Sequence, residues 1–324
     1  MMVGKTKRDD ADENSGNKFV CGVGGVDLFD AMPEGCIAYT LSYTGPLDAC
    51  RLATVSKIFK SAADSDAVWV RFLPSDYREI VARSDGGNNG LDMLDSISKR
   101  DLFFYLVDHP LLIDGSSMSF FLDKPTGKKC FTISAKKLAI TWGDTPRYWA
   151  FRPLPESSRF PEVAELNSVC WLEIRGKMKT SMLSPNTTYV AYLVFKMTEG
   201  AYGFYSPAEV TVKTQGSKSE TRKVYLQDEG GRNPRYQIVP RRMSLFNRIR
   251  TPFFEASPPV KKKDDKMLPN ERRDGWQEVA IGEFTTRVGE DGEVEMSVLE
   301  VEAGNWKSGL IVEGMELRPK VVSE

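Results

Sequence analysis

The hydrophobic pattern of this 324-residue chain changes at about Pro110, and the change limits the folds that the chain can adopt. Before Pro110, apolar residues recur at three- and four-residue spacing, as Leu52, Val55 and Phe59 do, which predicts an α-helical stripe. After Pro110, short apolar runs are separated by Gly, Pro, Asn and Asp, which is typical of the many short strands of a sandwich or barrel. The sequence therefore predicts a multidomain protein, with a small all-α N-terminal part followed by an all-β sandwich.

The helical part is predicted to occupy residues 27–75, after a polar, Gly-rich and disordered tail over residues 1–26. Pro46 suits the first position of a helix. Ser65 is placed to cap another helix, which carries Val68, Trp69 and Phe72.

A linker and one more helix are predicted over residues 76–110. The stretch from 84 to 95 is rich in Gly, Asn and Asp, which favours a linker. Ser98 followed by Asp101 predicts a capped helix start, and Pro110 ends that helix.

Composition argues against several classes of function. The single histidine, His109, directly precedes Pro110 and is predicted to lie at the surface at a helix end, so that neither a metal site nor a cofactor is predicted. The five cysteines are scattered and never in CxxC spacing, which predicts buried free thiols in a reducing compartment. The formal net charge of −1 argues against electrostatic nucleic-acid binding by the whole protein, and no run is apolar and long enough to cross a bilayer.

The β part is predicted to occupy residues 111–324. The run from Tyr189 to Phe195 is apolar at both odd and even positions, which predicts a strand covered on both faces. The segment from Glu293 to Val301 alternates acidic and apolar residues until Leu299, where a shift in the pattern predicts a β-bulge.

A basic insertion interrupts the β part at about residues 228–268. Between 230 and 263 it carries nine Lys and Arg against one Glu, so its charge by count is 9 − 1 = +8. This composition predicts an exposed, flexible segment between two strands. Its lysine run is either a candidate nuclear-import signal or a solubilising loop, and consists of Lys261, Lys262 and Lys263.

Two tryptophans flank a turn sequence in the β part. Trp142 and Trp149 lie on either side of Gly143-Asp144-Thr145-Pro146. Indole rings can stack on the C–H face of a pyranose ring, while Asp144 or a neighbour can accept hydrogen bonds from sugar hydroxyl groups. From the sequence, these two tryptophans could either bind sugar or lie in the core of the sandwich. Three other tryptophans are predicted to be core residues: Trp171, Trp276 and Trp306.

The helical segment FDAMPEGCIAYTLSYTGPLDACRLATVSKIFKSAADSDAVWVRFLP resembles an F-box. The similarity is carried by the Pro after an apolar residue, the Gly-Pro-x-Asp-Ala turn, the Leu-Ala-x-Val-Ser-Lys-x-Phe helix and the trailing Val-Trp. The resemblance implies docking onto a Skp-type adaptor of a cullin-RING ubiquitin ligase. The apolar face for this docking would comprise Met32, Pro33, Ile37, Leu41, Pro46, Leu52, Val55 and Trp69. A self-contained helical cap packed on the β part is the alternative.

The β part resembles the phloem protein 2 family of Nictaba-like lectins, and with the F-box the chain is similar to the plant F-box PP2-B subgroup. The resemblance is carried in order by ITWGDTPRYW, EVAEL, CWLEIRG, RDGW and WKSGLIV. It implies a jelly-roll-like lectin sandwich, with sugar binding at Trp142 and Trp149. Their neighbours are further candidates for carbohydrate binding, namely Asp144, Tyr148 and Phe151. Phe151 replaces a third aromatic residue of the family and lacks an indole N–H donor.

These features predict a non-catalytic substrate-recognition subunit of an SCF-type (Skp–cullin–F-box) ubiquitin ligase, in the cytoplasm, the nucleus or both. Its lectin-like domain would bind a glycan or glycoprotein. The alternative is an F-box adaptor whose sandwich binds a protein target and has lost sugar binding. A hydrolase is disfavoured, because the acidic residues between 290 and 295 alternate as on a solvent-facing strand, whereas a glycosidase needs two carboxyl groups facing one bond.

Overall fold

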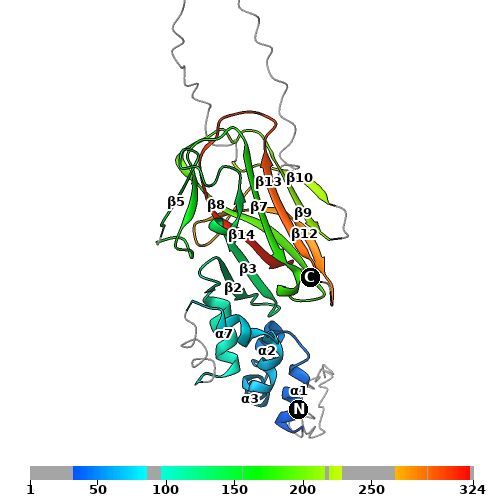
Figure 1. The fold of residues 1–324 in the computed structure, drawn as a ribbon. Coiled ribbons are helices and arrows are strands. Elements are labelled where there is room, and N and C mark those ends of the chain that lie inside the picture. The colour runs from blue at the N-terminus through cyan, green and yellow to red at the C-terminus, as the bar shows by residue number, and fades with distance from the viewer. Residues whose placement is uncertain are drawn as a thin grey trace, which may run out of the picture.

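The computed structural model describes residues 32–85, 96–154, 156–215, 219–227, 267–289 and 291–321. In Figure 1 the helices form a block at one end of a β-sandwich. The described α-helices precede Pro110 and the described strands follow it, so the predicted order of a helical part and a β part is confirmed. The predicted N-terminal tail and the lysine run 261–263, with nearly all of the basic insertion, lie outside the described residues.

Short helices with serine caps make up the helical block. Ser56, Ser65 and Ser98 each accept a hydrogen bond from a backbone N–H in the first turn of the helix that follows. The caps at Ser65 and Ser98 were predicted from the sequence and are confirmed. The helices are α1 (Glu34–Leu41), α2 (Pro46–Leu52), α3 (Lys57–Asp64), α4 (Asp66–Phe72), α5 (Tyr77–Ala82) and α7 (Lys99–Asp108).

The predicted helical stripe through Leu52, Val55 and Phe59 is wrong, because two helices share these residues. Helix α2 ends at Leu52, and α3 begins at Lys57 after Ser56. The Ser56 hydroxyl accepts from the N–H of Phe59, and this cap favours a new helix start over a continuous helix. Val55 consequently lies in the turn between the helices and is 66% exposed.

The core of the helical block is aromatic and includes helix α7. Trp69 is buried, and its indole N–H donates to the carbonyl oxygen of Ala63 at 2.6 Å. Its ring centroid lies 5.2 Å from those of Phe103 and Phe104, both on α7. Because α7 also packs against the first strands of the sandwich, one hydrophobic core runs from the helices into the sheets.

Two antiparallel sheets form the sandwich. The larger sheet, of nine strands, has the order β1 (Leu111–Ile113), β2 (Met118–Leu122), β3 (Lys129–Ser134), β14 (Ser308–Pro319), β8 (Thr187–Tyr202), β12 (Gln277–Thr286) and β11 (Asn270–Glu271), with β6 (Val163–Leu166) pairing β14 and β5 (Trp149–Arg152) pairing β6. The smaller sheet has the order β10 (Glu220–Val224), β9 (Ala208–Thr214), β13 (Glu293–Glu300), β7 (Leu172–Lys179) and β4 (Ala139–Ile140).

The burial of β8 agrees with the sequence pattern, whereas β13 differs from it at its end. From Tyr189 to Phe195, strand β8 is buried or half-buried on both faces, as predicted. The bulge predicted at Leu299 is wrong, because β13 keeps one register against β7 from Glu293 to Glu300. Glu300 faces inward, although the sequence pattern predicted only apolar residues at inward positions. The buried Lys307 pairs with Glu300 and so compensates its charge.

The junction between the helical block and the sandwich is closely packed. Lys129, on β3, is buried and its Nζ lies 2.9 Å from a carboxylate oxygen of Asp76. Gly127 has a φ of +68°, and a Cβ at this position would lie 2.8 Å from the carbonyl oxygen of Phe72. A polar pocket of about 530 Å³ remains beside this contact, between the two parts of the chain.

Gly127→Ala is expected to lower the free energy of unfolding by about 1–3 kcal/mol, because alanine at positive φ is strained and its Cβ would press on Phe72. Gly115→Ala is a matched control, since Gly115 has a φ of +66° but open space around its Cβ position. Chemical denaturation measures both variants. Equal losses at the two positions would contradict tight packing at the junction.

Candidate functional site

The turn predicted to bind sugar lies at the edge of the smaller sheet. Trp142 adopts a φ of +59°, which is uncommon for a residue with a side chain. Two hydrogen bonds hold this conformation: the N–H of Gly143 donates to Ile140 at 2.9 Å, and the N–H of Thr145 donates to Trp142 at 3.0 Å. The Trp142 side chain is 42% exposed, and its ring centroid lies 5.3 Å from that of the half-buried Tyr148. The turn thus presents an indole to solvent beside a phenol.

Trp149 does not share this surface. It is 2% exposed at the start of β5, where it pairs with Leu166 and belongs to the main hydrophobic core. The structure therefore contradicts a direct sugar contact for Trp149 and assigns it to the core, the other interpretation that the sequence allowed. Phe151 is half-buried and packs against the same core, whereas Asp144 is exposed in the turn.

Trp171 lies close to this turn and is exposed, although the sequence predicted it to be a core residue. It is 46% exposed, and its indole N–H donates to Oε2 of Glu173 at 3.1 Å. The hydroxyl of Thr141, adjacent to Trp142, donates to the same oxygen at 3.1 Å. Arg175 donates to the other oxygen, Oε1, at 2.7 Å. Glu173 therefore joins the Trp142 turn to Trp171.

The carboxylate at the centre of this group is held in its charged form. The hydrogen bond from Arg175 lowers the pKa of Glu173 from its ordinary value, and the bonds from Trp171 and Thr141 act in the same direction against partial burial. A charged carboxylate between exposed aromatic rings can accept hydrogen bonds from hydroxyl groups while the rings cover C–H groups. This is the chemistry that a pyranose ring requires. We call Trp142, Tyr148, Trp171 and Glu173 the aromatic site.

The alternation of residues along β7 could have identified Trp171 and Glu173 as outward-facing from the sequence. In β7 the residues with the parity of Leu172 are buried, and those with the parity of Glu173 and Arg175 face outward. Trp171 shares the outward parity, but its place in an apolar run favoured the core. Trp306 is likewise 55% exposed, against prediction, whereas Trp276 is buried as predicted.

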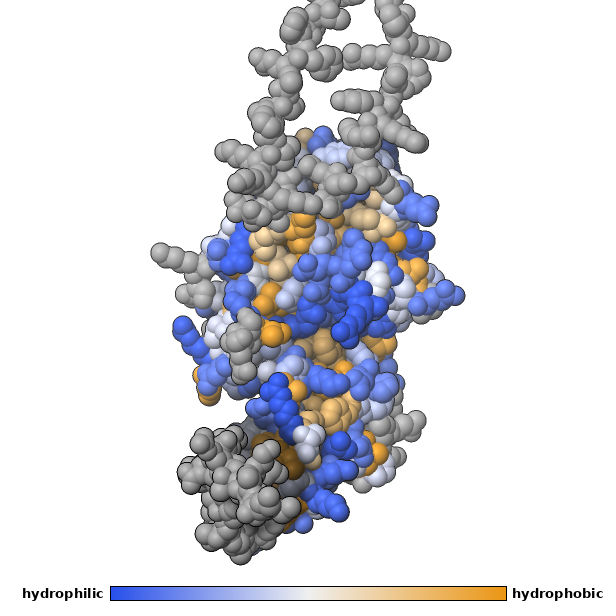
Figure 2. Space-filling view, turned by 180° about the vertical axis from the view of Figure 1, so that it is seen from behind, coloured by the Kyte–Doolittle hydropathy of each residue, from blue (hydrophilic) through white to orange (hydrophobic). Residues whose placement is uncertain are grey.

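The apolar face of the helical block differs from the predicted one. Met32, Pro33 and Val55 are exposed as docking requires, and Leu52 is half-buried. The remaining four residues of the predicted face are buried inside the chain, namely Ile37, Leu41, Pro46 and Trp69. They cannot touch a partner in this conformation, because Ile37, Leu41 and Trp69 belong to the hydrophobic core and Pro46 is covered beside Gly127. Instead, large apolar side chains are exposed at Tyr39, Tyr43, Leu47 and Val70. Seen from behind, the block shows hydrophobic patches within hydrophilic surface (Figure 2).

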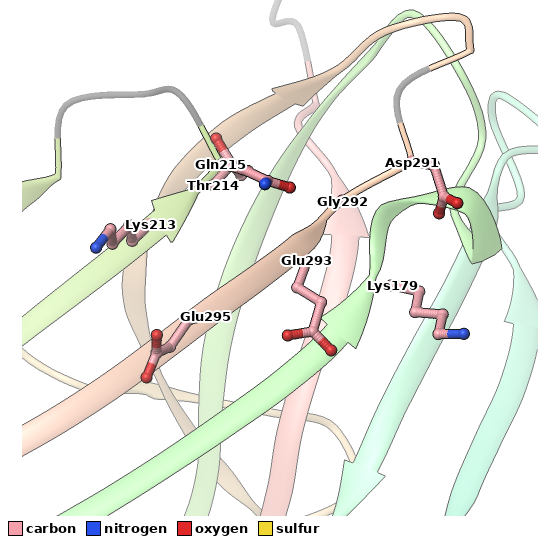
Figure 3. Close-up of a pocket in the computed structure, with 8 residues that line it drawn as sticks. All are labelled: Lys179, Lys213, Thr214, Gln215, Asp291, Gly292, Glu293 and Glu295. Atoms are coloured by element: carbon pink, nitrogen blue, oxygen red, sulfur yellow. The ribbon is translucent and has the colours of Figure 1, made fainter.

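A pocket of about 460 Å³ lies at the ends of β7, β9 and β13 (Figure 3). Its charged lining residues carry both signs: Lys179, Lys213, Asp291, Glu293 and Glu295. Glu295 is already engaged by Arg175 and Lys177, at 3.6 and 3.7 Å. Among the residues that the structure describes, none that lines this pocket is aromatic, so they offer no ring for stacking. The alternating acidic residues here face outward along a strand, as predicted.

The remaining groups with reactive chemistry are dispersed. Within the described ranges, no three His, Cys, Asp or Glu side chains come together as metal ligands, and no helix has the length and apolar content to cross a bilayer. His109 is exposed at the end of α7, as predicted. The prediction of buried thiols is right for Cys130 but wrong for Cys36, which is exposed. Cys50 and Cys170 are half-buried.

Known proteins share both parts of this architecture. The family model for phloem protein 2 matches residues 128–319, and that for the F-box domain matches residues 29–71. The chain is similar to the F-box protein PP2-B1 of Arabidopsis thaliana, with 41% identity over 312 residues that cover 90% of each chain. F-box protein PP2-B10 of the same plant is 40% identical over 90% of this chain and 94% of its own length. F-box protein VBF, also from this plant, is 39% identical over 89% of this chain and 99% of its own length.

Proposed function

The chain belongs to the phloem protein 2 family and carries an F-box domain ahead of the phloem protein 2 domain, and from this premise we propose that it is the substrate-recognition subunit of an SCF-type ubiquitin ligase. The exposed apolar face of the helical block binds a Skp-type adaptor. The aromatic site of the sandwich binds a glycan on the target. The protein makes and breaks no covalent bond itself, and it promotes ubiquitin transfer by holding the target near the conjugating enzyme.

The arrangement of the two surfaces is the observation that carries this proposal. Strand β7 has eight residues, from Leu172 to Lys179, and the chain then reaches Ser184 at the pocket beside the helical block (Figure 1). Trp171 directly precedes the other end of β7, so about 26 Å of strand, at roughly 3.3 Å per residue, separates it from the block end. An adaptor bound to the helices therefore leaves the aromatic site open to a target.

The size of the aromatic site favours weak binding of a single sugar. Each exposed indole that covers a sugar face contributes on the order of 1–2 kcal/mol. With hydrogen bonds to Glu173 and the cost of association, the free energy of binding is about −4 kcal/mol, which corresponds to a dissociation constant near 1 mM. Useful affinity for a target therefore depends on longer glycans or on several glycans at once.

Val55→Asp tests the adaptor surface. The affinity of the full chain for a Skp-type adaptor is expected to fall about 100-fold, because an unpaired carboxylate buried in an apolar interface costs about 3 kcal/mol. Val55 is exposed, so the fold should persist. Val288→Asp is the matched control, since Val288 is equally accessible but lies on the sandwich. Wild-type binding by both Val55→Asp and Leu47→Asp, measured by co-elution and titration, would refute docking through this face.

Glu173→Gln tests the aromatic site. Glycan binding by the full chain is expected to weaken about fivefold, because the neutral amide oxygen of Gln accepts a hydrogen bond from a sugar hydroxyl about 1 kcal/mol more weakly than a carboxylate does. Glu293→Gln is the control, as Glu293 is an exposed carboxylate on the same sheet that lies opposite Lys179, at the other end of β7 from Trp171. A glycan array followed by titration provides the measurement. A wild-type chain that binds the adaptor but no glycan would favour a sandwich that recognises protein targets instead.

A further inference from the structure

A second set of exposed aromatic side chains lies at the same end of the sandwich as the aromatic site. Tyr202 ends strand β8, Tyr205 follows in the loop to β9, and Trp306 lies in the loop before β14. All three are exposed. None of them belongs to the turn or the strand that carries Trp142 and Trp171.

A short path of backbone contacts connects the two sets. The side-chain amide of Asn167 donates to the carbonyl oxygen of Pro146 at 2.9 Å, and its backbone N–H donates to Tyr148 at 2.8 Å. Two residues further on, Val169 and Lys307 exchange both backbone hydrogen bonds, at 3.0 and 2.7 Å. The segment 167–171 therefore touches the Trp142 turn on one side and the Trp306 loop on the other. Trp171 ends this segment.

The Lys307 side chain fixes this arrangement. Lys307 is fully buried, and its Nζ donates to the carbonyl oxygens of Cys170 at 3.1 Å and Asn305 at 2.8 Å. It also forms an ion pair with Glu300, which is buried at the end of β13. The two carbonyl groups belong to the residues next to Trp171 and Trp306. One buried cation therefore holds the backbones of both exposed tryptophans.

The tyrosines are held against the same loop. Gly203 has a φ of +90°, and a Cβ there would lie 2.0 Å from the carbonyl oxygen of Trp306. Only glycine permits this close approach. Tyr202 and Tyr205 flank Gly203 in sequence, so their backbone is packed directly onto the Trp306 loop. Exposed rings on a rigid frame lose little conformational entropy on binding, which favours recognition.

We propose that Trp306, Tyr202 and Tyr205 form a second aromatic subsite, so that the end of the sandwich binds an extended oligosaccharide across several sugar units. The inference rests on the proposed glycan function and deepens it. The exposed large apolar side chains that the structure describes at this end are all aromatic: Trp142, Trp171, Tyr202, Tyr205 and Trp306. Rings without exposed aliphatic neighbours suit the C–H faces of successive sugars. Polar groups are close by, since Glu173 accepts a hydrogen bond from Trp171 and Asn305 adjoins Trp306 in the chain. A protein partner is the competing occupant.

Trp306→Ala tests the second subsite in the full chain. The probes are linear oligomers of N-acetylglucosamine, mannose and galactose of increasing length, beginning with the monosaccharides. Wild type is expected to bind more tightly as the oligomer lengthens. Trp306→Ala should bind monosaccharides as wild type does and the longer oligomers about tenfold more weakly. Trp306→Phe, which keeps a ring, should recover most of this loss, and Val288→Ala should show none.

The outcomes separate the two proposals. If wild type binds glycans and Trp306→Ala shows the same dependence on length, the second subsite is refuted and the aromatic site stands. If wild type binds none of the probes at any length, both proposals fail together. Circular dichroism of each variant shows whether it is folded. Should Trp306→Ala unfold, Tyr205→Ala replaces it, with the same expected loss for long oligomers.

Discussion

Trp149→Ala is expected to lower the free energy of unfolding by about 3–5 kcal/mol, whereas Trp142→Ala should cost less than about 1 kcal/mol. The difference arises because Trp149 is buried in the main core and Trp142 projects from an exposed turn. Replacing Trp142 also removes none of the core contacts that hold β5 to β6. Chemical denaturation of the two single variants measures both values.

Glycan binding should show the opposite order at a temperature where both variants are folded. Trp142→Ala is expected to weaken binding about tenfold, because the stacked indole is lost. Any loss in Trp149→Ala should follow the unfolded fraction. A folded Trp149→Ala variant that loses binding while its stability is unchanged would show that Trp149 contacts the sugar after all. A variant that carried both substitutions could not separate a lost sugar contact from a lost core residue, so the two single variants are needed.

Glu316→Ala is expected to destabilise the sandwich by about 3–5 kcal/mol, because it leaves three half-buried arginines without their common, fully buried partner. Glu316 is fully buried on β14. Its oxygens lie 3.1 Å from Arg272, 3.4 Å from Arg159 and 3.3 Å from Arg318. The Thr132 hydroxyl donates to Oε2 at 3.1 Å.

The pKa of Glu316 also predicts how this contribution depends on pH. Burial alone would raise the pKa, but attraction to Arg159, Arg272 and Arg318 outweighs burial and lowers it below the ordinary value. A carboxyl group with a lowered pKa in the folded state stabilises the fold above its unfolded pKa, near 4.3. That stability is lost as the pH falls through the folded pKa. The deficit of Glu316→Ala should therefore be full at neutral pH and shrink in acid.

Glu283→Ala is the control for this measurement. Glu283 pairs with Lys320 at 2.7 Å, but both side chains are about a third or more exposed, so that the expected loss is below about 1 kcal/mol. Denaturation curves at neutral and acid pH compare the two variants. A loss in Glu316→Ala as small as that in Glu283→Ala would contradict a buried ion network that holds the sandwich together.

The network has a structural link to the aromatic site. Arg159 belongs to the segment between β5 and β6, and its backbone N–H donates to Glu313 at 3.1 Å. Trp276 donates to the carbonyl oxygen of Ser157, in the same segment, at 2.5 Å. These contacts hold the segment on the outer face of the larger sheet. Because β5 begins at Trp149, directly after the turn, the network also supports the position of that turn.

Local chemistry in the sequence determined the elements and their order. Ser65 and Ser98 cap helices where the pattern predicted, because a cap requires only a side chain and the N–H groups a few residues ahead. The change from helical spacing to short runs at Pro110 likewise places the boundary between helices and strands. These features depend on neighbours in the chain, so a single sequence contains them.

The tertiary structure alone decided which tryptophans meet solvent and which apolar helix residues remain available for a partner. Alternation in β7 identifies the two faces of the strand, but only the second sheet shows which face is covered. Trp149, a predicted sugar-binding residue, is therefore buried, and Trp171, a predicted core residue, is exposed. Glu300 faces inward, where the buried Lys307, seven residues further along the chain, pairs with it. Burial depends on which residues from elsewhere in the chain pack against a side chain, and the periodicity of the sequence does not identify those residues.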